Sequence, residues 1–167
     1  DNNGCSNVDS VTIFVKPFPA LVSSGNSSIC ADSTLSLSVA GATTYSWSPA
    51  NLVSNASSAN PNFTGTQSAE LYVTGTTNGC SKKDTLNIIV KPLPQLQTIA
   101  DTIICKQQNI LLTTTGANTY SWSPALQLNN PNIASPTFTG NVSQKYYVTG
   151  FVAGCSKTDS VEVTIHN

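Results

Sequence analysis

The chain has 167 residues and a formal net charge of −1, with 7 lysine and arginine residues against 8 acidic residues. Charged residues make up 9% of the chain, compared with about 25% in an ordinary globular domain, so no basic surface is available for nucleic acid or an anionic membrane. No apolar run approaches the roughly 18 residues that cross a bilayer, and we expect no membrane insertion in this segment.

The sequence repeats itself every 75 residues. GATTYSWSPA occupies positions 41 to 50, and GANTYSWSPA occupies positions 116 to 125. The same shift maps Cys80 and Cys155 onto Cys5 and Cys80 without a gap. A period of this length indicates tandem copies of one folding unit. We predict that residues 1–18 are the C-terminal strand of an incomplete preceding repeat, that residues 19–93 form one repeat and that residues 94–167 form another.

The first predicted strand carries alternating apolar residues, Val11, Ile13 and Val15. It lacks the first strand of its hairpin, and an isolated strand with one apolar face is not stable in water. If it is ordered, we expect a neighbouring copy of the repeat to cover it.

Within each repeat, apolar residues alternate with polar ones, as in a strand with one buried face. The pattern predicts a strand through Leu35, Leu37 and Val39 and a last strand whose inward residues are Leu86, Ile88 and Val90 in one copy and Val161, Val163 and Ile165 in the other. Asn-Gly at positions 78 and 79 predicts a type I′ turn before that last strand, whereas Ala-Gly at 153 and 154 matches this turn less well.

No helical periodicity extends beyond two turns. About seven short strands per repeat, separated by Gly, Pro and Asn, indicate an all-β fold. We predict tandem immunoglobulin-like (PKD-like) Greek-key β-sandwiches.

The repeated TYSWSP stretch places two aromatic residues of each copy on one face of a strand. Tyr45 and Trp47 alternate with serines, as do Tyr120 and Trp122. The rings follow the apolar face, and we predict that all four belong to the core, where a Trp buries on the order of 200 Å². The alternative is an exposed platform on which sugars stack.

Lys-Pro-x-Pro stretches at 16–19 and 91–94 join the copies. Alternate prolines favour an extended backbone, which predicts short, semi-rigid spacers. With strands of about eight residues and a rise of about 3.3 Å per residue, one repeat would add roughly 35 to 45 Å to an array.

Five cysteines without a CxxC motif or a Cys/His cluster favour disulfides and an oxidising compartment over a metal site. One scheme pairs Cys30 with Cys80 and Cys105 with Cys155, leaving Cys5 for an upstream repeat. Another pairs Cys5 with Cys30 and Cys80 with Cys105, leaving Cys155 for a following repeat. We favour the first scheme, because a repeat that closes its own loop of about 50 residues gains on the order of 4 kcal/mol in the chain-entropy model.

The layout resembles a known repeat class. Its motifs are GATTYSWSPA, NGCS, the D-[ST]-aliphatic triplets and V-K-P-x-P, and they are similar to tandem Ig-like or PKD-like repeats of large Bacteroidota surface proteins. These proteins include gliding-motility adhesins of the SprB type, exported by type IX secretion. The resemblance implies an extracellular, cell-surface or filament-forming protein and brings no catalytic residues. The Gly that is common after the first Cys of the family is absent at Ala31-Asp32 and Lys106-Gln107.

The resemblance also implies O-glycosylation at Asp-Ser/Thr-aliphatic motifs. The candidate residues are Ser10, Ser33, Thr85, Thr102 and Ser160. Alternatively, these triplets merely flank strands, because short motifs are common in a chain rich in Ser and Thr.

Residues that could support catalysis are sparse. The single histidine, His166, aligns with the linker residue Lys91, and the acidic residues are widely separated. No Ser/His/Asp arrangement, phosphate loop or repeated metal motif occurs, so we expect no enzyme, no cofactor and no metal.

The leading hypothesis is a structural stalk or filament segment of a large secreted bacterial surface adhesin, with neighbouring repeats of the same chain or fibre as partners. The alternative is a polysaccharide-binding module that uses exposed aromatics. The candidate contact residues lie off the core face: Phe14, Tyr72, Tyr147 and Phe151.

Overall fold

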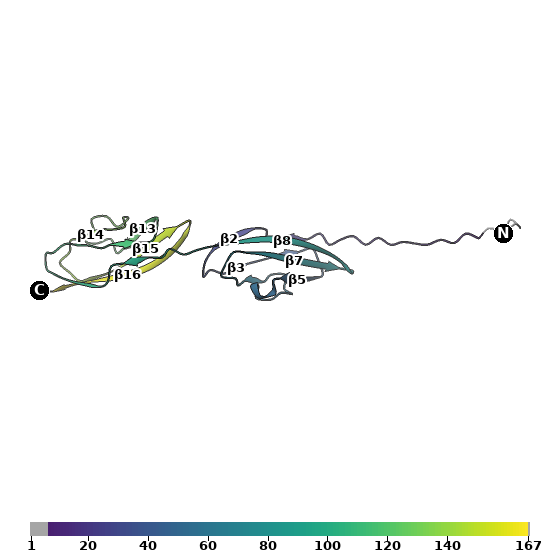
Figure 1. Ribbon diagram of the computed structural model, residues 1–167, viewed down its shortest axis with the longest axis horizontal. Coiled ribbons are helices and arrows are strands. Elements are labelled where there is room, and N and C mark those ends of the chain that lie inside the picture. Colours follow the sequence, from purple (N-terminus) through teal and green to yellow (C-terminus); the bar gives the residue numbers. More distant parts are fainter. Residues whose placement is uncertain (1–6, 167) are drawn as a thin grey trace. The chain divides into compact units, whose positions relative to one another are not determined.

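The computed structural model describes residues 7–166, which are almost entirely β-strands and loops (Figure 1). The short 3-10 helix η1 (Ala50–Leu52) is the one helical element in that range. Between residues 7 and 166, no helix is long and apolar enough to cross a membrane.

Eight strands form the first repeat. They are β1 (Val22–Ser23), β2 (Ser27–Cys30), β3 (Leu35–Ser36), β4 (Val39–Ala40), β5 (Thr44–Ser48), β6 (Asn62–Phe63), β7 (Ala69–Thr77) and β8 (Cys80–Lys91). Four of them make one sheet in the order β2-β8-β7-β5, and the short pairs β1-β4 and β3-β6 lie outside it. β2 runs parallel to β8, with Cys30 opposite Lys91.

The second repeat reproduces this topology. Its strands are β9 (Gln97–Thr98), β10 (Thr102–Cys105), β11 (Ile110–Leu111), β12 (Thr114–Thr115), β13 (Thr119–Ser123), β14 (Thr137–Phe138), β15 (Gln144–Val152) and β16 (Cys155–His166). The four-stranded sheet has the order β10-β16-β15-β13, and the short pairs are β9-β12 and β11-β14. β10 runs parallel to β16, with Cys105 opposite His166.

The strand predicted through Leu35, Leu37 and Val39 is divided in two. β3 pairs with β6, whereas β4 pairs with β1, so the chain changes its partner at Leu37. The Leu37 N–H bonds to the Pro61 carbonyl, 2.9 Å away, between the two strands. The alternation of inward residues survives the change, because Leu37 and Val39 are both buried.

Both predicted hairpins are confirmed. β7 and β8 are joined through Asn78 and Gly79, which have φ angles of 52° and 83°. Ala153 and Gly154, between β15 and β16, have φ angles of 50° and 84°. The turn conformation is therefore the same in both repeats, although Ala replaces Asn in the second, where the left-handed conformation is less favourable.

Each repeat buries a tryptophan from an edge strand of its large sheet, β5 in the first repeat and β13 in the second. Trp47 is 2% exposed and Trp122 is 3% exposed. The core of the second repeat contains residues from the large sheet and from the short strands: Leu112, Trp122, Phe138, Tyr146, Val148, Val161 and Val163. Where the first repeat has Val39, the second buries Thr114, whose hydroxyl lies 3.2 Å from the Thr98 hydroxyl. The buried polar group is therefore paired.

These features define an all-β fold in which each repeat is an immunoglobulin-like sandwich. In each repeat the four-stranded sheet and the short strand pairs pack around a buried Trp. The first strand of the large sheet in chain order, β2 or β10, pairs in parallel with the last, β8 or β16. Such a tandem of sandwiches agrees with the predicted fold class.

Residues 7–21 contain no strand. The apolar side chains of Val11, Ile13 and Val15, predicted to form one face of a strand, are all exposed. They have no hairpin partner and no second layer to pack against, which is the condition under which a single strand is unstable. Their origin in a preceding repeat stays a prediction, as do the repeat boundaries.

The chain divides into two compact units. The first comprises residues up to Asn26, Thr34–Gly65 and Glu70–Asn87, and the second comprises Ser27–Ser33, Thr66–Ala69 and the chain from Ile88 on. The division assigns β2 and the last part of β8 to the unit that holds the second repeat.

Replacing Trp122 by Ala should lower the free energy of unfolding of the second repeat by about 3–5 kcal/mol, because it leaves a large cavity in the core. The control Val142→Ala changes an exposed side chain and should alter stability by less than about 0.5 kcal/mol. Urea unfolding followed by far-ultraviolet circular dichroism measures both. Equal unfolding midpoints for the two variants would contradict this account of the core.

Stability should also fall at high pH because of Tyr146. Burial raises the pKa of this phenol to about 12, from 10.0, so the folded state keeps a proton that the unfolded state loses. The stabilising contribution is complete below about pH 10 and is lost as the pH rises towards 12. Ultraviolet titration of tyrosinate should show a step near pH 12 that Tyr146→Phe removes and Tyr147→Phe retains. The pKa of Tyr72 is also raised, by Glu70, so the assignment is tested by the step near pH 12: a step there that survives Tyr146→Phe would refute it.

Candidate functional site: the cystine cluster

The cystine cluster consists of Cys30, Lys91, Ala153, Gly154 and Cys155. Cys30 and Cys155 form a disulfide with their Cα atoms 5.6 Å apart, within the range that this bond requires. All five residues belong to the second compact unit.

Strand pairing positions one half of the cluster. Cys30 ends β2 opposite Lys91, and the chain then turns away, with the Ala31 N–H bonded to the Lys91 carbonyl at 2.8 Å. The Ser33 N–H bonds back to the Cys30 carbonyl at 3.2 Å, through a turn in which Asp32 has a φ of 63°. The backbone on both sides of Cys30 is therefore held by hydrogen bonds.

The hairpin turn positions the other half. Cys155 begins β16 directly after the Ala153-Gly154 turn, and its side chain is buried. The Lys91 ammonium donates a hydrogen bond to the Ala153 carbonyl, 3.3 Å away. From the sequence, Lys91 was predicted to be a spacer residue only. A lysine recurs at this position in both Lys-Pro-x-Pro stretches, and that recurrence was the sequence feature that could have indicated the contact.

The predicted pairs Cys30–Cys80 and Cys105–Cys155 are wrong, because Cys30 is bonded to Cys155 and both Cys80 and Cys105 are free thiols. The cause is the parallel pairing of the first strand of the sheet with the last. Cys30 lies beside Lys91, the last residue of the 12-residue strand β8, whereas Cys80 is its first residue. At about 3.3 Å per residue the two ends are roughly 36 Å apart, far beyond the reach of a disulfide.

The alternative pairs are not formed either, because Cys30 is bonded to Cys155. Cys80 is not joined to Cys105. Cys5, which the same scheme pairs with Cys30, lies outside the described residues. Cys105 is exposed and Cys80 is partly buried.

The aromatic residues of the TYSWSP stretches lie in two environments. The indole N–H groups of Trp47 and Trp122 donate to the carbonyls of Ser58 and Ile133, at 2.9 and 3.0 Å. Both rings are inside the sandwiches and are unavailable for stacking on a sugar.

Tyr45 and Tyr120, also predicted to be core residues, are half-buried. Each phenol bonds to the residue three positions earlier: Tyr45 donates to the Ala42 carbonyl at 2.8 Å and accepts from its N–H at 3.0 Å. Tyr120 makes the same pair of bonds with Ala117. The hydroxyls therefore fix the turn that precedes the Trp strand.

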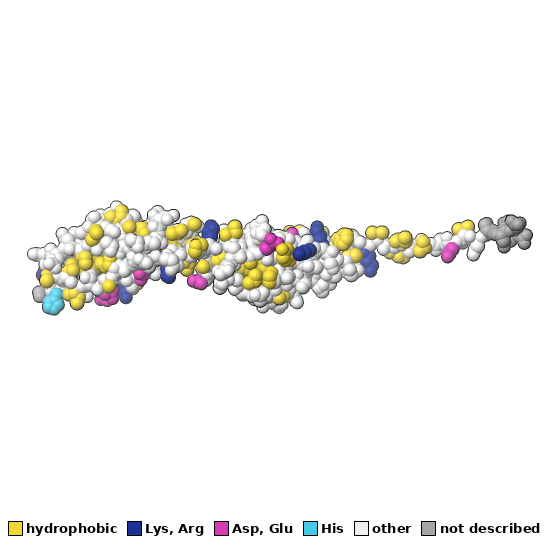
Figure 2. All heavy atoms as spheres, in the orientation of Figure 1, with side chains coloured by type: hydrophobic (Ala, Val, Ile, Leu, Met, Phe, Trp, Pro, Cys, Tyr) yellow, Lys and Arg dark blue, Asp and Glu magenta, His cyan; other side chains and the backbone are white. Residues whose placement is uncertain are grey.

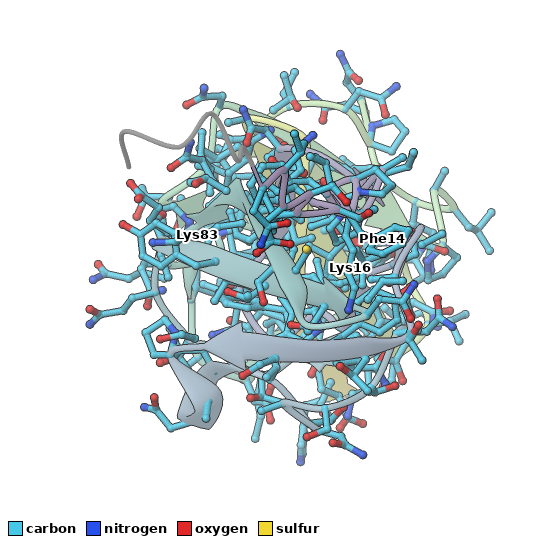
Figure 3. All side chains as sticks on the ribbon, turned by 90° about the vertical axis from the view of Figure 1, so that its right-hand side faces the viewer. Phe14, Lys16 and Lys83 are labelled. Carbon is cyan, nitrogen blue, oxygen red and sulfur yellow. A yellow bond between two sulfur atoms is a disulfide. The ribbon has the colours of Figure 1, made fainter. Side chains whose placement is uncertain are left out.

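The off-face aromatics are accessible to different degrees. Phe14 is 85% exposed, Tyr147 is 50% exposed and Phe151 is 40% exposed. Tyr72 is half-buried, and the Lys83 ammonium lies 3.5 Å from the centre of its ring (Figure 3). Among these residues, Tyr147 and Phe151 share one strand, β15, and its outward face. The equivalent positions of the first repeat are Tyr72 and Thr76.

Three of the predicted glycosylation motifs share one backbone arrangement. The amide N–H of Ser10, Thr85 and Ser160 each donates to the carboxylate of the preceding Asp, at 2.8 to 2.9 Å. Ser10, Ser33 and Thr85 are exposed, whereas Thr102 and Ser160 are half-buried. Glycosylation of these residues stays a prediction.

Side chains that could support catalysis or bind a metal are dispersed. Figure 2 shows few charged side chains, scattered among uncharged ones, on the face that it displays. Among residues 7–166, no group of three or more His, Cys, Asp or Glu side chains is arranged to hold a metal ion. His166 lies opposite Cys105 at the end of β16.

No protein-family model matches the chain, and no curated protein does either. Among solved structures, it is similar to the insect immune protein hemolin, with 14% identity and a TM-score of 0.48, over 95% of this chain and 49% of hemolin. The extracellular domains 3–5 of Drosophila OTK match with 11% identity and a TM-score of 0.48, over 85% of this chain and 60% of that one.

Titin domains Z1Z2 in complex with telethonin match with 14% identity and a TM-score of 0.35, over 90% of this chain and 98% of that one. This chain spans about half the length of the hemolin structure. Identities and scores this low carry no functional argument. The immunoglobulin-like assignment therefore rests on strand order and core composition.

The cystine cluster predicts which thiols react without prior reduction. Iodoacetamide added to the native protein should label Cys105 and, more slowly, the partly buried Cys80, while Cys30 and Cys155 react only after reduction and unfolding. Peptide mass spectrometry measures each position, and Cys105→Ser is the matched control for the fast reaction. Labelling of Cys30 or Cys155 in the unreduced protein would show that the disulfide is absent.

Proposed function

We propose that this chain is a segment of a structural stalk or filament in a large secreted bacterial surface adhesin, and that its repeats act by spacing and not by catalysis. The observation that carries the proposal is the burial of Trp47 and Trp122 inside separate sandwiches. The largest aromatic side chains pack in the interior of each repeat and are not accessible to a ligand.

Three further features support a stalk. The repeats follow one another through Lys-Pro-x-Pro spacers, whose proline φ angles restrict the backbone. A disulfide is stable in an oxidising, extracellular setting, and its presence supports a location on the cell surface or in a secreted filament. The sequence resemblance to Bacteroidota surface arrays points to the same setting. The partners of the segment are then neighbouring repeats of the same chain or fibre.

Glycans on the Asp-Ser/Thr motifs would complement this function. Only 9% of residues are charged, so attached sugars would supply hydration to a surface that is poor in charge. Ser10, Ser33 and Thr85 are the accessible acceptors, and the half-buried Thr102 and Ser160 are less accessible.

A second candidate, polysaccharide binding, is favoured by one observation. Tyr147 and Phe151 lie on the outward face of β15, four residues and roughly 13 Å apart along the strand, and both are partly exposed. Saturable binding of a polysaccharide that is lost in Tyr147→Ala and Phe151→Ala, but kept in the control Leu126→Ala, would favour this candidate over the stalk.

The stalk predicts that length increases linearly with repeat number. Chains that carry one, two and four extra copies of residues 17–91 after His166 should lengthen by roughly 35 to 45 Å per copy, because each sandwich adds the length of its strands and turns. Electron microscopy of individual molecules, or small-angle X-ray scattering, measures this increment. Arrays that collapse into a globule, with no constant increment per copy, would overturn the proposal.

A further inference from the structure

Cys80 and Cys105 are equivalent to residues that are already bonded. A shift of 75 residues maps Cys30 onto Cys105 and Cys80 onto Cys155. The disulfide therefore joins the first cysteine of one repeat to the second cysteine of the repeat that follows it in sequence. Cys80 is the second cysteine of its repeat and is not bonded to a first cysteine. Cys105 is the first cysteine of its repeat and is not bonded to a second cysteine.

The surroundings of Cys80 reproduce one half of the cystine cluster. The Lys16 ammonium donates to the Asn78 carbonyl at 3.2 Å (Figure 3), as the Lys91 ammonium does to the Ala153 carbonyl at 3.3 Å. The Cys80 thiol lies 3.8 Å from the Lys16 carbonyl oxygen and donates to it. All of these residues belong to the first compact unit, so the arrangement forms there without the disulfide.

The surroundings of Cys105 reproduce the other half. Cys105 lies opposite His166 on parallel strands, as Cys30 lies opposite Lys91. The Lys106 N–H bonds to the His166 carbonyl at 3.1 Å, and the Gln108 N–H bonds to the Cys105 carbonyl at 3.1 Å, as at the equivalent positions after Cys30. The intervening Gln107 has a φ of 69°, close to the 63° of Asp32. The backbone arrangement is kept although the side chains differ: Lys91, Ala31, Asp32 and Ser33 are replaced by His166, Lys106, Gln107 and Gln108.

We propose that Cys80 and Cys105 are half-sites for further disulfides with additional copies of the repeat. Cys80 pairs with the equivalent of Cys30 in the preceding repeat, and Cys105 pairs with the equivalent of Cys155 in the following repeat. Each repeat is then bonded to both of its neighbours in sequence, and never to itself. This pairing does not depend on what the array carries, so its failure would leave the stalk function untouched.

Each bond forms by oxidation of two thiols. A small disulfide such as oxidised glutathione accepts the two electrons through thiol–disulfide exchange. One cysteine thiolate attacks it and releases one reduced thiol, and the second cysteine thiolate then displaces the other. The two protons of the cysteines pass to the two released thiolates. The result is one cystine and two reduced glutathione molecules.

The disulfide-closed loops would overlap along the chain, and this overlap would hold the array together after a backbone cut. Each disulfide spans 125 residues, which is longer than the 75-residue period, so successive loops overlap along the array. A backbone cut at any interior position, including a Lys-Pro-x-Pro spacer, then falls within at least one closed loop. Its two sides stay joined until the disulfides are reduced.

The test uses an extended chain: residues 1–166 followed directly by a second copy of residues 17–93, which keeps the period intact. After oxidation with glutathione, a non-reducing digest analysed by mass spectrometry should contain two linkages. One is Cys30–Cys155, which also shows that the chain has folded and been oxidised. The other joins Cys105 to the appended copy of Cys80, and the alkylation of Cys105 that is expected in the 167-residue chain should disappear.

The matched control is the same extended chain with Cys105→Ser, which should retain Cys30–Cys155 and leave the appended copy of Cys80 alkylatable. Placing residues 17–91 in front of Pro17 instead tests the other half-site, and Cys80 should then pair with the added copy of Cys30. If Cys30–Cys155 forms while Cys105 stays alkylatable, or if Cys105 pairs with any other cysteine, the proposal is overturned.

Discussion

The parallel pairing of β2 with the end of β8 determines the covalent structure of this protein. A parallel neighbour enters a sheet in the same direction as its partner, so β2 ends where β8 ends. The cysteine that ends β2 and the cysteine that begins β8 are thereby held at opposite ends of one long strand. The same register recurs between β10 and β16, so it is a property of the repeat.

The hydrophobic interior and the disulfide consequently have separate roles. In many immunoglobulin-like sandwiches a disulfide joins the two layers beside the Trp. Here the layers are held by apolar packing around Trp47 or Trp122, with the indole N–H bonded to a loop carbonyl. The bonded cysteines lie at strand ends, outside the core cluster that contains Trp122, and they connect β2 to the hairpin that begins β16. Each sandwich can thus be small and still be joined by a disulfide to its neighbour in sequence.

Much of the fold could be predicted from the sequence, because local patterns report local structure. Alternation of apolar residues identified the inward faces of the long strands, and Asn78-Gly79 identified the hairpin. The 75-residue period predicted that the two halves share one topology. The break between β3 and β4 could not be predicted, because a change of partner leaves the alternation through Leu37 intact.

The cysteine pairing was mispredicted for a physical reason. Loop-closure entropy favours a disulfide within a repeat, but it does not depend on whether β2 runs parallel or antiparallel to β8. The parallel register places Cys30 and Cys80 too far apart for a disulfide. The spacing of 50 residues between Cys30 and Cys80 is compatible with either outcome. Lys91 was similarly read as part of a spacer, whereas its ammonium contacts the turn beside Cys155. Contacts of this kind depend on how strands are ordered in the sheet, which a single sequence does not state.

A distance between the two cysteines of one repeat tests this account most directly. In a chain with Cys5→Ser, Cys105→Ser and Cys155→Ser, only Cys30 and Cys80 remain to carry spin labels. Double electron–electron resonance should then report a separation of roughly 36 Å, the length of β8 at about 3.3 Å per residue. A separation below about 15 Å, or a spontaneous disulfide between these two residues, would contradict the parallel register on which the account depends.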